Sequence, residues 1–170
     1  MTDPIGNITV KVAIKDAAGD ALVGATATIK PKPTNGDGTG TTNKDGVANI
    51  SANRQPYTAG GSLRGYSSKS GFPVVNGEAT VTLSVPSGSG TLKITVNNST
   101  GGAIAEATVT VTSTISQKTN SDGVAALGLV AGPYTNITAS AAGYTTSTAI
   151  SKSVTDGGTT LHTITLAAAS

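Results

Sequence analysis

Few side chains in this sequence have the types and spacing that chemistry requires. The chain of 170 residues contains no cysteine and a single histidine, His162. A disulfide is therefore excluded, and a transition-metal site is disfavoured. No serine, aspartate or cysteine motif flanks His162 to make it a catalytic base. We predict a non-catalytic protein without a cofactor, in which His162 is either partly buried on a strand or preceded by a β-bulge after Leu161.

Two loops rich in oxygen ligands superficially resemble calcium sites. They are Asn35–Gly38 and Asn43–Gly46. Neither loop has the spaced carboxylates and the terminal glutamate of a calcium-binding loop. Asn, Asp and Gly are also the residues that tight turns require. We therefore favour turns over a metal site in both places.

The aromatic residues are the candidates for binding through stacked rings. Tyrosines on one face could form a platform for a sugar. The four tyrosines fall at equivalent positions of a repeat, however, which favours a structural role. We expect Tyr57 and Tyr134 to pack in or cap the core, with each phenol reaching a backbone group. Tyr66 and Tyr144 each follow a glycine and are expected to be exposed near strand ends. Phe72 lies outside the repeat on a predicted loop, so Phe72, Tyr66 and Tyr144 are the candidate partner contacts.

The elements that position these residues occur twice along the chain. Residues 42–48 read TNKDGVA and residues 119–125 read TNSDGVA, and a Pro-Tyr-Thr and a Gly-Tyr pair follow in each copy. A repeat of this length is a whole small domain. Asp45-Gly46 and Asp122-Gly123 are predicted tight turns, because glycine takes the positive φ that such turns need.

Short strands dominate the predicted secondary structure. Apolar and polar residues alternate in several segments, which are separated by turns every ten residues or so. This pattern predicts an all-β protein of two tandem sandwiches: a first domain over residues 1–86, a short linker over 87–90 and a second domain over 91–170. The second copy has one extra residue after its first tyrosine, so we expect a β-bulge near Thr135-Asn136.

The order of these motifs resembles the carboxypeptidase regulatory-like domain family. The matching elements are a GAT-type strand, a T-N-x-D-G turn, a Pro-Tyr strand, a Gly-Tyr pair and a closing strand, and the two copies cover nearly all of the chain. The resemblance implies a transthyretin-like or immunoglobulin-like Greek-key β-sandwich. It also implies a structural or binding module, because the family consists of accessory domains rather than peptidase domains.

The composition of the chain argues against a nucleic acid as partner and against a membrane span. Charged residues are 12% of the chain, the net charge is +2, and the basic residues are scattered singly, so we predict no nucleic-acid binding. No apolar run approaches the roughly 20 residues of a membrane span. The opening residues, MTDPIGN, lack the basic and apolar regions of a secretory signal.

These observations favour a structural and interaction protein with protein partners. We predict either self-association or binding to a capsid or surface protein, including by strand addition at a sheet edge. The favoured hypothesis is a virion surface accessory, such as a phage capsid decoration or fibre component. The alternative is a secreted cell-surface adhesin or carbohydrate-binding module, with a glycan as ligand.

Overall fold

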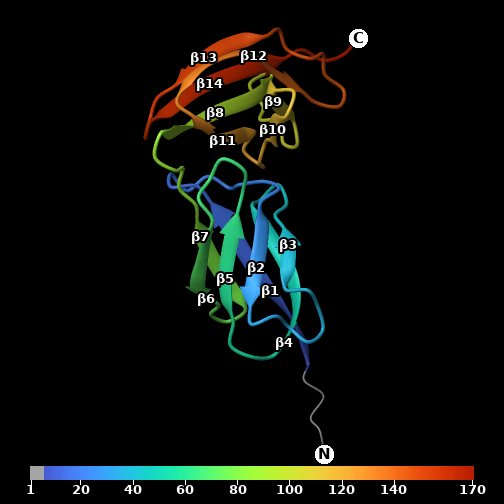
Figure 1. Ribbon diagram of the computed structural model, residues 1–170. Coiled ribbons are helices and arrows are strands. Elements are labelled where there is room, and N and C mark those ends of the chain that lie inside the picture. The colour runs from blue at the N-terminus through green and yellow to red at the C-terminus, as the bar shows by residue number, and fades with distance from the viewer. Residues whose placement is uncertain (1–5) are drawn as a thin grey trace, which may run out of the picture. The chain divides into compact units, whose positions relative to one another are not determined.

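The computed structural model describes residues 6–170, and these residues fold as an all-β protein. The all-β class is therefore confirmed. The chain divides into two units (Figure 1). The first comprises the described residues up to Leu63 together with Ser68–Leu83, and the second comprises Arg64–Ser67 and Ser84–Ser170. Residues 1–5, where the predicted first domain begins and which include most of the MTDPIGN segment, lie outside the described residues.

The first unit is built from two sheets. The three-stranded sheet has the order β4-β1-β7, and the four-stranded sheet has the order β3-β2-β5-β6. Strand β1 pairs antiparallel with β4 and parallel with β7. The strands are β1 (Asn7–Lys15), β2 (Thr26–Lys30), β3 (Thr39–Thr41), β4 (Val47–Asn53), β5 (Thr58–Ser62), β6 (Lys69–Pro73) and β7 (Glu78–Thr82).

The second unit repeats this topology strand for strand. Its sheets have the orders β11-β8-β14 and β10-β9-β12-β13, and β8 again pairs antiparallel with one neighbour and parallel with the other. The strands are β8 (Ser89–Asn98), β9 (Thr108–Thr112), β10 (Ile115–Lys118), β11 (Val124–Val130), β12 (Gly132–Ser140), β13 (Ile150–Val154) and β14 (Thr159–Leu166). Strand β8 begins at Ser89, inside the segment 87–90 that was expected to be a linker.

Alternating apolar residues build the core of each unit. Along β8, Leu92, Ile94 and Val96 are fully buried, and they pack with Ile137 of β12 and Ile164 of β14. This cluster draws on both sheets, which is the arrangement of a β-sandwich. With no tryptophan in the chain, small aliphatic side chains fill the core.

The β-bulge predicted in the second copy is confirmed. The pairing of β12 with β13 shifts register between Tyr134 and Ile137. Asn136, inside this interval, has a φ of +62°, a conformation that asparagine tolerates better than most residues. The bulge absorbs the extra residue, so that Ile137 and Ala139 still face the core.

Within residues 6–170, no helix is long and apolar enough to cross a membrane.

Candidate interaction site

The duplicated T-N-x-D-G segment forms the same turn in both units. Gly46 and Gly123 have φ values of +70° and +74°. In the second unit the Asn120 side-chain oxygen accepts hydrogen bonds from the N–H groups of Asp122 and Val124, at 3.0 and 2.9 Å. Asp122-Gly123 therefore lies in a tight turn, as its sequence predicts, and the asparagine that holds the turn was not predicted.

The same turn is held in the first unit by Asn43. Its side-chain oxygen accepts hydrogen bonds from the N–H groups of Asp45 and Val47, at 2.9 and 3.1 Å. This places Asp45-Gly46 in the predicted turn. The sequence does contain a signal for these two asparagines. Both copies have asparagine at this position, whereas the next residue differs and is Lys44 in one copy and Ser121 in the other.

The threonine that opens this segment ties it to a neighbouring strand. The hydroxyl of Thr119, which is completely buried, donates to the carbonyl of Ile104 at 2.7 Å and accepts from the N–H of Ala107 at 2.9 Å. Thr42 makes the equivalent bonds in the first unit. These threonines are structural residues that the sequence analysis did not identify.

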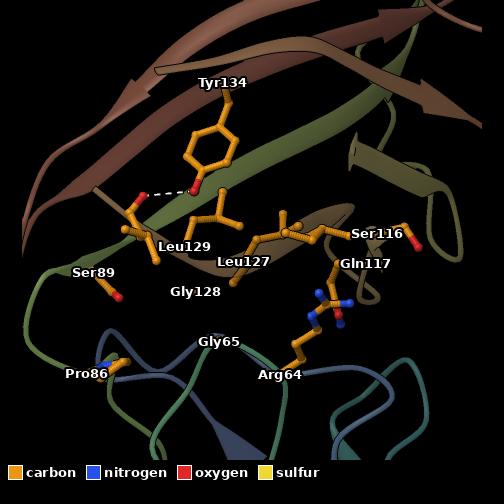
Figure 2. Close-up of a pocket in the computed structure, with 13 residues that line it drawn as sticks. Arg64, Gly65, Pro86, Ser89, Ser116, Gln117, Leu127, Gly128, Leu129 and Tyr134 are labelled. Carbon is orange, nitrogen blue, oxygen red and sulfur yellow. Dashed lines mark hydrogen bonds between the residues drawn. The ribbon is translucent and has the colours of Figure 1, made fainter. Parts of the chain in front are cut away.

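Tyr134 packs at the margin of the second core, as predicted. Its ring contacts the core cluster, and its hydroxyl donates to the backbone carbonyl of Val130 at 2.9 Å. Figure 2 shows this bond as a dashed line, with the ring above Leu127 and Leu129 of β11. Tyr57 is also buried, but its hydroxyl donates to the side chain of Asn53 at 2.9 Å rather than to the backbone.

The candidate contact residues are less accessible than expected. Tyr66 is buried, with 8% of its surface exposed, and the next residue, Ser67, pairs with Ser84. Tyr144 is half-buried against the core cluster of the second unit. The expectation that these two rings are exposed is therefore wrong.

Phe72 lies on a strand rather than a loop, contrary to expectation. It is half-buried on β6 and pairs with Ala59 of β5. A register shift between Ala59 and Gly61 allows β6 to pair with β5 across the irregular segment. Phe72 belongs to the first unit, whereas Tyr66 and Tyr144 belong to the second, so these residues do not form one site within a unit.

Strand β14, at one edge of the second unit's three-stranded sheet, offers backbone groups to a binding partner. Strand β14 pairs with β8 on one side only, in an uninterrupted parallel register from Thr159 to Leu166. The N–H of Thr91 on β8 bonds the carbonyl of Gly158, so the even-numbered residues of β14 bond β8. The N–H and C=O groups of Thr159, Leu161, Thr163 and Thr165 therefore point away from β8, and among the described residues no strand or isolated bridge pairs with them.

This open edge has defined ends. Beyond β14, Ala167 and Ala169 bond backbone groups of Thr145 and Gly143, so that part of the edge is covered. Before it, the turn at Asp156-Gly157 leads into the strand. Leu161, whose surface is 70% exposed, lies near the middle of the uncovered stretch.

The equivalent edge in the first unit, formed by β7, carries a charged residue whose backbone groups are already bonded. On β7, Glu78 pairs with Lys11, just as Leu161 pairs with Lys93 in the second unit. The N–H and C=O groups of Glu78 bond those of Val75, and its carboxylate lies 3.8 Å from the Lys11 ammonium. A charge and a backbone turn therefore occupy this edge at Glu78, whereas β14 has neither at Leu161.

His162 is partly buried on β14, and the strand continues without a bulge after Leu161. The first of the two predicted alternatives is therefore the one observed. Burial, and secondarily the positive charge of Lys152 on β13, lower the pKa of His162 below its ordinary value of 6.5. The native protein thus favours the neutral imidazole.

We expect this pKa difference to make stability depend on pH. Below about pH 6.5 the unfolded chain binds more protons than the native protein, so stability falls from there down to the lowered native pKa and then levels off. Thermal unfolding at about pH 7.5 and about pH 5 should show a small loss for the wild type and a smaller one for His162→Gln. An equal loss in both proteins would contradict this assignment.

The two loops that resemble calcium sites form turns. Asp37 accepts a hydrogen bond from the N–H of Thr39 at 3.1 Å, and bonds from Thr39 lower the pKa of Asp37. Asp45 forms a 3.0 Å ion pair with Lys44. Over residues 6–170, no group of His, Cys, Asp or Glu side chains is arranged to hold a metal ion.

Comparison with known proteins adds several similar structures. No protein-family model and no curated protein matches the sequence. The TIE protein of Bacillus anthracis is 22% identical with a TM-score of 0.40, over 94% of this chain and 34% of that one, so this chain spans about a third of it. The minor pilin GBS52 of Streptococcus agalactiae is 13% identical with a TM-score of 0.40, over 95% of this chain and 96% of that one. A double mutant of the shaft pilin SpaA of Lactobacillus rhamnosus GG is 13% identical with a TM-score of 0.39, over 97% and 99% of the two chains.

At these TM-scores the likeness identifies no family. The carboxypeptidase regulatory-like and transthyretin-like assignment is not confirmed, and the description of the fold rests on this chain's own strands.

Proposed function

We propose that this chain is a non-catalytic structural and binding protein that is displayed on a surface. The observation that carries the proposal is the use of its repeated polar residues. Thr42 and Thr119 bond backbone groups across neighbouring segments, and Asn43 and Asn120 bond the backbone of their own turns. What the two copies share is therefore a set of residues that holds a sandwich together, not a set that assembles a reaction site. The carboxypeptidase regulatory-like resemblance, as a prediction, agrees with this role.

Binding through a sheet edge fits the structure better than binding through stacked aromatic rings. Tyr57 and Tyr66 are buried, and Phe72, Tyr134 and Tyr144 are half-buried. The aromatic residues of residues 6–170 therefore offer no fully exposed ring on which a sugar could stack. Strand β14, by contrast, presents unpaired backbone groups to a protein partner.

The surface of display is that of a cell or of a virion. Both settings suit a chain of low charge in which threonine is the most frequent exposed residue on the strands. An antibody raised against the whole chain tests the proposal on intact cells of the source organism and on particles purified from its cultures. Labelling of intact cells supports a cell-surface protein, and labelling of particles supports a virion accessory.

The control is an antibody against a cytoplasmic protein, which should label permeabilised cells only. If the antibody against this chain also labels only permeabilised cells, and labels no particles, the proposed display is wrong.

A further inference from the structure

We propose that β14 pairs with β14 of a second copy of this chain, which joins the two second units through one continuous sheet. This inference rests on the proposed function and names its partner. It starts from the open edge described above, where the backbone groups of Thr159, Leu161, Thr163 and Thr165 point away from β8. An unpaired edge of this kind is a template for another strand.

The composition of the edge favours a second copy as the occupant. Residues 159–166 read TTLHTITL and contain no Lys, Arg, Asp or Glu. When two identical strands pair antiparallel about a two-fold axis, residues near the axis lie beside their own counterparts in the other copy. A charged residue near the axis would therefore face a like charge. The absence of charge removes this obstacle. Natural edges usually carry a lysine, a proline or a bulge against such pairing, and β14 has none of them.

The hydrogen-bonding pattern of β14 permits one register that uses the whole open stretch. In an antiparallel pair, residues whose backbone groups point outward must oppose one another. A register centred on His162 places Leu161 opposite Thr163 of the second copy, and Thr159 opposite Thr165. Every outward-facing residue from Thr159 to Thr165 then has a partner, and the covered residues beyond Leu166 are not needed. In this register the exposed side chain of Leu161 lies on the outer face of the joined sheet, diagonally across from Leu161 of the second copy. Each of these leucines therefore gains an apolar neighbour.

The side of β14 that faces the other sheet does not compete with this pairing. The Thr160 hydroxyl donates to the carbonyl of Ser153 on β13 at 2.9 Å. This bond uses a side chain of an even-numbered residue, so it leaves the outward backbone groups free.

The first unit supplies an internal comparison. Its equivalent strand carries Glu78 where β14 carries Leu161, and Val75 already bonds the Glu78 backbone. Of these two equivalent strands, only β14 therefore has an edge that is both open and uncharged, and we assign self-pairing to β14.

The test measures self-association of the whole chain by sedimentation velocity from about 1 µM to about 1 mM. We expect the wild type to be in a monomer–dimer equilibrium within this range. Leu161→Glu introduces at an exposed position of β14 the negative charge that Glu78 carries at the equivalent position of β7. It should weaken the dimer at least about tenfold, with an unchanged melting temperature.

A second variant separates backbone pairing from side-chain contact. Thr163→Pro removes an outward N–H that β8 does not use, and edge strands accept proline at such positions. It should also weaken the dimer at least about tenfold. The matched control is Thr80→Pro, the same change at the equivalent outward position of β7, which should leave the dimer unchanged.

Hydrogen exchange resolved by residue identifies the surface that is used. The amides of Leu161 and Thr163 should be protected in the wild-type dimer and should exchange quickly in monomeric Leu161→Glu. A wild type that stays monomeric throughout the range, or a Leu161→Glu dimer as strong as the wild type, would overturn the inference. A monomeric protein that is nevertheless displayed on cells or particles would retain the proposed function and lose only the dimer.

Discussion

Replacing Thr119 by valine is expected to lower the free energy of unfolding of the second unit by about 3 kcal/mol. Valine has nearly the same shape as threonine but cannot bond the carbonyl of Ile104 or the N–H of Ala107. Both backbone groups would then be left without the partner that the buried hydroxyl supplies. Equilibrium unfolding in urea, followed by circular dichroism, measures the change.

The control for this prediction is Thr119→Ser, which keeps the hydroxyl and removes one methyl group. It should lose only about 1 kcal/mol. Thr42→Val makes the same change in the first unit and should lower the stability of that unit instead, because the bonds of Thr42 are equivalent. If the valine variant were as stable as the serine variant, the hydroxyl would not be the stabilising group.

Gly123→Ala is the second change with a large expected effect, also about 3 kcal/mol. Gly123 has a φ of +74°, which strains any residue with a Cβ. A Cβ there would also lie 2.8 Å from the carbonyl oxygen of Val96 and 3.1 Å from the Cβ of Ala103. Conformational strain and crowding therefore add, and unfolding in urea again gives the measurement.

Gly101→Ala separates the two contributions. Gly101 has a φ of +87°, but a Cβ at this position would have nothing within 4 Å. The loss should be about 1 kcal/mol, from the backbone conformation alone. Equal losses at Gly101 and Gly123 would mean that crowding by Val96 and Ala103 contributes nothing.

The local features of the fold could be predicted because they follow from local patterns. Alternating residues such as Leu92, Ile94 and Val96 form a half-buried strand wherever it pairs. The two Asp-Gly turns depend on a glycine at a positive φ. The bulge at Asn136 could be predicted by comparing the two copies, because one extra residue must be absorbed if Ile137 is to stay in the core.

The features that the sequence analysis missed depend on contacts between distant segments. Thr119 looks like any other threonine of a threonine-rich chain until Ile104 and Ala107 are known to lie beside it. Phe72 lies outside the repeat, in a Ser-Gly-Phe-Pro segment that predicts a loop, yet pairing with β5 makes a strand of this segment. The open edge of β14 follows from the order of strands in a sheet, which local periodicity does not determine.

The parallel neighbours β8 and β14 have a mechanical consequence. They are the first and last strands of the second unit, so tension applied at the two ends of the unit pulls them in opposite directions along their length. The bonds of the ladder are then loaded together in shear instead of opening one after another. The first unit has the same geometry between β1 and β7, but its ladder has five residue pairs against eight in the second unit. Under a steady pull on the chain the first unit should therefore yield before the second, which would act as the more resistant link.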